Sequence, residues 1–254
     1  VEDKEIQDIL MFLQKERLDV FNYPFKKKYQ DIPIDIGYDA KRDMFYAFWH
    51  EKKMYLSRKY NSRAYAENYI RCMMIEQDKE SPHYYREPQR YLKGNGIAID
   101  AGAAEGLWAL DVLDYVQKVI LIEYDREWLE ALRYTFEPYG DKIEIINKPL
   151  VEHGNRNGIS ISDIYQKEGN IACIKMDIEG METGILQSEM ELLSTDAVAH
   201  LLVCTYHKPN DEQEIENILC ASGYRTQFSK GYIFFLFGEE ILPELRRAVI
   251  EAEK

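Results

Sequence analysis

Four ionisable side chains lie at the ends of apolar segments that have the composition of buried strands. They are Asp100, Glu123, Asp177 and His207. The carboxyl ends of parallel strands meet in the crevice where open α/β sheets bind ligands. Carboxylates there can hold an ammonium or accept hydrogen bonds from hydroxyls, and a histidine can take up a proton near neutral pH. The pattern predicts a polar ligand site with a proton acceptor at one sheet edge.

A glycine turn follows the first of these acids. Gly102 and Gly106 stand in the pattern D-x-G-x-x-x-G that begins at Asp100, and helical spacing follows over residues 105–117. The dinucleotide fingerprint G-x-G-x-x-G places a pyrophosphate at a helix N-terminus, whereas an acid at this position would repel a pyrophosphate and favour an ammonium. S-adenosylmethionine carries a sulfonium and an ammonium but no phosphate. The alternative is an ordinary turn whose glycines serve packing.

Glu123 ends the next apolar strand, about twenty residues past the glycine turn. A carboxylate there accepts hydrogen bonds from both ribose hydroxyls. The two strand-end carboxylates therefore fit a nucleoside ligand, either NAD or S-adenosylmethionine, and Asp100 favours the latter.

Three motifs in order resemble those of the FkbM family of S-adenosylmethionine-dependent methyltransferases. The segment 171–182 is similar to the family signature K-x-D-x-E-G-x-E, while 99–106 and 122–125 resemble its first and second motifs. The resemblance covers roughly residues 83–237. It implies a class I methyltransferase fold and methyl transfer to a hydroxyl oxygen of a sugar, a glycan or a natural product. It also implies cofactor binding by Asp100, Gly102, Ala103, Gly106, Glu123, Tyr124, Leu150, Val151 and Asp177.

Two segments bear on the ligands that this resemblance implies. Leu150 and Val151 occupy the place where such folds hold the adenine ring. The loop at 153–158 is shorter than in the family, so we expect the N-terminal region to contact the acceptor, including some of its aromatic side chains. Tyr84, Tyr85 and His83 are candidates for contact with the methionine part.

The sequence divides at residue 80. Residues 1–80 predict an α+β region with an amphipathic helix at 3–18, strands at 32–38, 44–49 and 53–57, and a helix at 61–78. Residues 81–254 predict the methyltransferase domain, a Rossmann-like α/β fold with a mostly parallel sheet and a terminal antiparallel hairpin at 223–228 and 232–237. Its other elements are expected as strands at 97–100, 119–123, 143–146, 171–176 and 199–206, and helices at 105–117, 126–137 and 211–222.

Composition narrows the partners. The 254 residues are 46% hydrophobic and 30% charged, and the net charge of -13 argues against a nucleic-acid surface. Four well-separated cysteines suggest buried thiols rather than zinc ligands. The absence of a long apolar run argues against a membrane span, and the acidic N-terminus is unlike a signal peptide. These features favour a cytoplasmic protein, and the first helix could form a homodimer.

Several mechanisms fit these residues. One of His207 and Asp177 accepts the acceptor's proton while the other orients it, with no metal. Alternatively, Asp177, Glu179 and His207 hold Mg²⁺ that acidifies a diol; activity surviving EDTA would exclude this. Other function classes are an NAD-linked oxidoreductase and a non-catalytic S-adenosylmethionine-binding protein.

Overall fold

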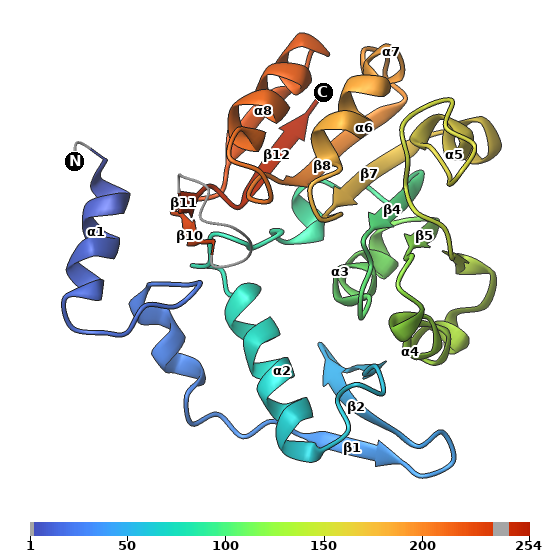
Figure 1. The fold of residues 1–254 in the computed structure, drawn as a ribbon. Helices are drawn as coiled ribbons and strands as arrows, with labels where there is room; N and C mark the ends of the chain where they lie inside the picture. Colours follow the sequence, from blue (N-terminus) through green and yellow to red (C-terminus); the bar gives the residue numbers. More distant parts are fainter. Residues whose placement is uncertain (1–2, 236–243) are drawn as a thin grey trace.

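A seven-stranded mixed sheet forms the centre of the computed structural model, which describes residues 3–235 and 244–254 (Figure 1). The strand order is β6-β5-β4-β7-β8-β12-β9, and all neighbours are parallel except β12, which is antiparallel to β8 and β9. This confirms the predicted class I methyltransferase fold. The strands are β4 (Ile97–Ala101), β5 (Lys118–Ile122), β6 (Ile143–Ile146), β7 (Ile171–Met176), β8 (Val198–Cys204), β9 (Arg225–Phe228) and β12 (Val249–Glu253).

The sheet separates two apolar cores, because successive strand residues point to opposite faces. Ala98 of β4 belongs to one core, while its neighbours Ile97 and Ile99 belong to the other. The first face carries α2 (Arg63–Glu76), α3 (Leu107–Val112) and α4 (Arg126–Phe136). The second face carries α5 (Ile161–Glu168), α6 (Glu182–Ser188), α7 (Met190–Leu193) and α8 (Asp211–Ala221). Short 3-10 segments are η2 (Pro88–Arg90), η3 (Leu113–Tyr115) and η4 (Glu137–Lys142).

The N-terminal region packs on the first face. It contains a small antiparallel sheet of β1 (Ile36–Asp39), β2 (Met44–Trp49) and β3 (Lys52–Tyr55). Strand β3 contacts α4, and α2 contacts β1 and β2, so this small sheet shares the first core with the main sheet (Figure 1). Of the aromatic side chains of β2, Phe45, Tyr46 and Trp49 pack against this core, whereas Phe48 is exposed.

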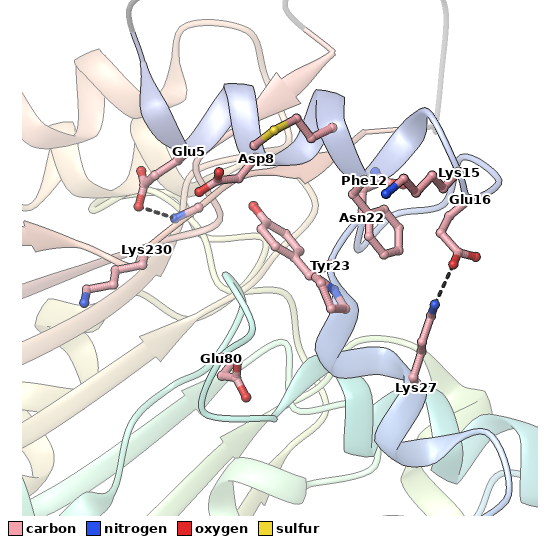
Figure 2. A pocket seen from close by; sticks show the side chains of 13 residues that line it. Glu5, Asp8, Phe12, Lys15, Glu16, Asn22, Tyr23, Lys27, Glu80 and Lys230 are labelled. Carbon is pink, nitrogen blue, oxygen red and sulfur yellow. Dashed lines mark hydrogen bonds and ion pairs between the residues drawn. The ribbon is translucent and has the colours of Figure 1, made fainter.

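The first helix, α1 (Lys4–Leu13), lies beside η1 (Pro24–Tyr29), and a groove of about 590 Å³ separates them (Figure 2). Glu5 accepts a hydrogen bond from the Gly231 amide at 3.0 Å, and Lys27 of η1 pairs with Glu16. Leu10 and Met11 of α1 are exposed. Among the residues that the structure describes, no helix is long and apolar enough to cross a membrane.

The predicted terminal hairpin is wrong in its pairing. β9 pairs with β12, whereas β10 (Ile233–Phe234) pairs with β11 (Leu245–Arg246) in a separate two-stranded sheet. Residues 236–237 of the predicted strand lie outside the described residues. Turn residues near 229–231 favour pairing of sequence neighbours, but a local pattern carries no information about the distant segment that forms β12.

Candidate active site

The register of three parallel strands brings the predicted motifs to one edge. Ala101, the last residue of β4, pairs with Ile122 of β5 on one side and with Met176 of β7 on the other. The next residue of each strand therefore emerges at the same level. Gly102, Glu123 and Asp177 lie there together, as the sequence predicts.

The first glycine permits a close crossing of two strand-end loops. Gly102 has a φ of +73°, and a Cβ built on it would lie 1.8 Å from the carbonyl oxygen of Asp177. Only glycine fits such an approach in this backbone region. Gly106, with a φ of +80°, differs: its Cβ would meet the Phe136 ring at 2.5 Å, so this glycine allows α3 to begin against α4. Gly106 thus serves packing in this structure.

Two cavities flank the glycine loop. The outer one, of about 430 Å³, is lined by Glu123, Tyr124 and Leu150 among others, and the inner one, of about 160 Å³, by Asp100 and Ala103 among others. Gly102, Ala104 and Asp177 line both cavities.

Val151 does not line either cavity, although its neighbour does. The Val151 Cγ1 atom would lie only 2.6 Å from a Cβ on Gly158, which shows that this side chain packs against the 158 backbone. The predicted adenine contact of Leu150 fits the outer cavity, and that of Val151 does not.

Glu123 is buried and fixes the loop that faces it. Its carboxylate accepts hydrogen bonds from the Ala104 amide at 2.8 Å and from the Asp125 amide at 2.7 Å. Burial raises the pKa of Glu123, while these two amide hydrogen bonds oppose the rise. Each carboxylate oxygen has a second lone pair, so the side chain retains capacity for ligand hydroxyls.

Asp100 has an ammonium partner within the chain that the sequence analysis missed. Asp100 and Lys175 are register partners on β4 and β7, and Lys175 Nζ lies 3.1 Å from Asp100 Oδ1. Lys175 also donates to the Gly102 carbonyl at 2.6 Å. Burial acts to lower the pKa of Lys175, but the charges of Asp100 and Asp177 outweigh it and raise that pKa. A lysine within an otherwise apolar strand, two residues before Asp177, was the signal for this pair.

Asp177 is the centre of a hydrogen-bonded cluster. The hydroxyls of Tyr85 and Tyr206 donate to its two oxygens at 3.2 and 3.1 Å. Burial acts to raise the pKa of Asp177, but the charges of Lys175, His83 and His207 outweigh it, so its pKa lies below the ordinary value. The structure thus holds Asp177 as an oriented carboxylate where the inner and outer cavities meet.

His207 lies behind this carboxylate. Its Nε2 is 3.3 Å from Asp177 Oδ1 and its Nδ1 is 3.0 Å from Glu182 Oε1, and it lines neither cavity. Burial acts to lower the pKa of His207, but the contact with Glu182 and the charges of Glu182 and Asp177 raise it overall. An imidazole between two carboxylates is suited to orient Asp177.

The residues of the magnesium alternative are only partly together. The Glu179 side chain is 94% exposed, and its Oε2 lies 3.8 Å from His207 Nε2. The buried Glu182, by contrast, has a carboxylate oxygen close enough to Asp177 and His207 for the three to share a metal ion. His83, Asp177 and Cys204 form a second such group. In the group of Asp177, Glu182 and His207, Glu182 Oε1 accepts a hydrogen bond from the Ile178 amide at 2.8 Å, whereas the buried Glu182 Oε2 has no hydrogen-bond partner among the described residues. Any metal here would use Glu182 in place of Glu179.

Comparisons with known proteins complete this description. Residues 151–226 match the model of the Methyltransferase FkbM domain, a range that includes the whole signature segment 175–182. The crystal structure of methyltransferase FkbM from Methylobacillus flagellatus KT is 21% identical, with a TM-score of 0.50 over 74% of this chain and 53% of that chain. This chain thus spans about half the length of that protein.

Precorrin-6y C5,15-methyltransferase from Geobacter metallireducens GS-15 is 11% identical, with a TM-score of 0.46 over 66% of this chain and 86% of that chain. No protein of curated function matches this sequence. Residues 151–226 are thus similar to the Methyltransferase FkbM domain, and the fold of the chain is similar to that of methyltransferase FkbM.

Proposed function

We propose that this protein is an S-adenosylmethionine-dependent methyltransferase that acts on a hydroxyl oxygen. One observation carries the proposal: two cavities of different character meet at Gly102, Ala104 and Asp177 on the carboxyl edge of the sheet. A nucleoside with a charged amino-acid extension needs one wider cavity and one narrow polar cavity that communicate.

The outer cavity suits the nucleoside. Glu123 offers buried carboxylate oxygens to ribose hydroxyls, and Leu150 offers an apolar surface to the base, beside the ring of Trp128. Tyr124 lies at the rim, where its side chain is 70% exposed. These are the groups expected of a nucleoside site, in which mostly apolar walls carry a few placed polar atoms.

The inner cavity suits a zwitterionic amino-acid end. It combines the carboxylates of Asp100, Glu76 and Glu105 with the ammonium of Lys175. Burial raises the pKa of Glu105 to about 7, against the hydrogen bond that it accepts from Tyr69. An end group with one charge of each sign finds partners of both signs here.

When bound, S-adenosylmethionine supplies a methyl group on a positively charged sulfur. The chain's own residues must align the acceptor and receive its proton. We assign the proton to Asp177, which lines both cavities and which two tyrosine hydroxyls and His207 orient. His207, which lines neither cavity, is a positioning residue in this scheme.

Calorimetric titration with S-adenosylhomocysteine tests this proposal. Binding to the wild type is expected in the micromolar range and at least tenfold weaker in Glu123→Gln, which keeps one acceptor for the Ala104 amide but loses the carboxylate. The exposed Glu127→Gln is the matched control and should bind like the wild type. Binding of NAD in place of S-adenosylhomocysteine would instead assign the chain to the oxidoreductases.

A further inference from the structure

A third cavity, of about 270 Å³, adjoins the inner cavity just described. The two cavities share Glu76, so this side chain lies where they meet. His83 and Tyr206 also line the third cavity, and both contact Asp177: His83 Nε2 is 3.8 Å from Asp177 Oδ2, and the Tyr206 hydroxyl donates to Oδ1. The third cavity is therefore separated from the proposed proton acceptor by one layer of side chains.

The rest of this cavity is apolar. It is built by the segment before η1, by α2 and by the strand β10, three parts that are distant in the sequence. Asp19 and Lys26 also line it, but they pair with each other. The apolar lining side chains are Val20, Phe21, Ile75, Ile233, Phe234 and Phe235.

The other polar groups of this cavity, the Glu76 carboxylate and the Tyr206 hydroxyl, gather around His83. Its Nδ1 is 3.3 Å from Glu76 Oε1, and its Nε2 is 3.3 Å from the Tyr206 hydroxyl. A polyhydroxylated sugar would leave most of its hydroxyls against the apolar walls, where an unpaired polar group costs roughly 1–3 kcal/mol. A flat ring with one hydroxyl would place the ring among the phenylalanines and the hydroxyl at His83.

We propose that this cavity binds the methyl acceptor, and that the acceptor is an aromatic hydroxyl compound rather than a sugar. This inference rests on the proposed methyltransferase function. In the reaction the acceptor oxygen forms a bond to the methyl carbon while the bond from that carbon to sulfur breaks. The sulfur keeps the electron pair and becomes a neutral thioether. The hydroxyl proton passes to one nitrogen of His83 while the other nitrogen gives up its proton, which reaches Asp177 through the Tyr206 hydroxyl that contacts both residues.

The acidity of the acceptor supports this class. A phenolic hydroxyl, like that of tyrosine, ionises near pH 10, and an aliphatic hydroxyl is a weaker acid still. Asp177 is a weak base, because its pKa lies below the ordinary value. A weak base removes a proton more readily from the more acidic of two hydroxyl classes.

Calorimetry with 1-naphthol, in the presence of S-adenosylhomocysteine, tests the inference, with methyl α-D-glucopyranoside as the sugar probe. Two variants change the cavity: Cys72→Trp narrows it from α2, and Phe234→Ala removes an aromatic wall. Cys220→Trp is the matched control, because Cys220 is an exposed cysteine on α8, outside this cavity. We expect 1-naphthol to bind the wild type and the control equally, and each cavity variant at least tenfold more weakly.

S-adenosylhomocysteine affinity, measured on the same samples, separates the two proposals and reports on folding. Two outcomes with unchanged S-adenosylhomocysteine affinity would show that the acceptor assignment is wrong. In the first, 1-naphthol fails to bind the wild type. In the second, 1-naphthol binds both cavity variants as tightly as it binds the wild type. Tighter binding of the glucoside than of 1-naphthol would also overturn it. If S-adenosylhomocysteine fails to bind the wild type, the methyltransferase proposal itself fails, and the acceptor role falls with it.

Discussion

The proposed cofactor cavities and the proposed acceptor cavity are built in different ways. The former lie at the ends of β4, β5 and β7, which are neighbours in one sheet and which fix their side chains through backbone register. The proposed acceptor cavity is lined by side chains from residues 19–26, from α2 and from β10, and these three segments do not belong to one sheet. The comparison teaches that backbone pairing positions the strand-end residues of the proposed cofactor cavities, whereas side-chain packing forms the proposed acceptor cavity.

The largest effect should follow a change in the backbone crossing at the cofactor cavities. Gly102→Ala places a Cβ 1.8 Å from the Asp177 carbonyl oxygen and requires a positive φ of a non-glycine residue. We expect it to lower the free energy of unfolding by more than about 3 kcal/mol and to abolish S-adenosylhomocysteine binding. Denaturant unfolding and calorimetry measure both effects.

Gly154→Ala is its control, since Gly154 has a φ of +82° but nothing within 4 Å of the added Cβ. It should cost only about 1–2 kcal/mol. Equal losses in the two variants would show that the crossing of Gly102 with Asp177 is not a tight constraint.

The next largest effect concerns the residue shared by the inner and outer cofactor cavities. Asp177→Asn keeps the shape of the side chain but removes the negative charge that is to receive the proton. Turnover should fall about 10²–10⁴-fold, while S-adenosylhomocysteine affinity changes far less. Steady-state kinetics and calorimetry measure the two quantities.

Asp141→Asn is the matched control, because Asp141 is exposed and lines none of the three cavities. It should leave turnover unchanged. A comparable loss of affinity and turnover in Asp177→Asn would reassign Asp177 to cofactor binding alone.

The smallest effect should come from the imidazole behind Asp177. The pKa of His207 is raised in the folded state, so its contribution to stability is present below the unfolded value of about 6.5 and is lost as pH rises through the folded pKa. His207→Gln removes this dependence. Between about pH 6 and pH 9, the wild-type Tm should fall by about 2–4 °C more than the variant Tm.

The exposed His153→Gln serves as the control and should follow the wild-type curve. Parallel curves for the wild type and His207→Gln would contradict the charged contact with Glu182 and Asp177. Turnover of His207→Gln should fall less than that of Asp177→Asn, as expected of a positioning residue.

Patterns along the chain were sufficient for the five parallel strands of the sheet and for the side chains at their carboxyl ends. Apolar strand segments followed by Glu123 and Asp177 predict that these two residues share one sheet edge, because parallel register converts equal strand ends into one spatial edge, whereas Asp100 lies one residue inside β4. The same reasoning missed the pairing of Asp100 with Lys175, which depends on which strand becomes the neighbour of β4.

Other features could not be read from local patterns. The Glu182 side chain is buried, whereas Glu179 has a positive φ of 56° and its side chain is exposed to solvent. These side-chain directions depend on the conformation of the folded turn. β12 pairs with segments about twenty or more residues away. The third cavity needs three segments to pack before it exists, so its residues carry no common motif.

The position of β12 has a consequence for the order in which the chain can fold. β8 and β9 have no ladder between them, and each uses residues 249–253 as its antiparallel neighbour. During synthesis from the N-terminus, both strands therefore keep an open edge until those residues emerge. Such edges are templates for pairing with another chain. A truncation before residue 249 should thus favour aggregation, even though it leaves every residue of the three cavities in place.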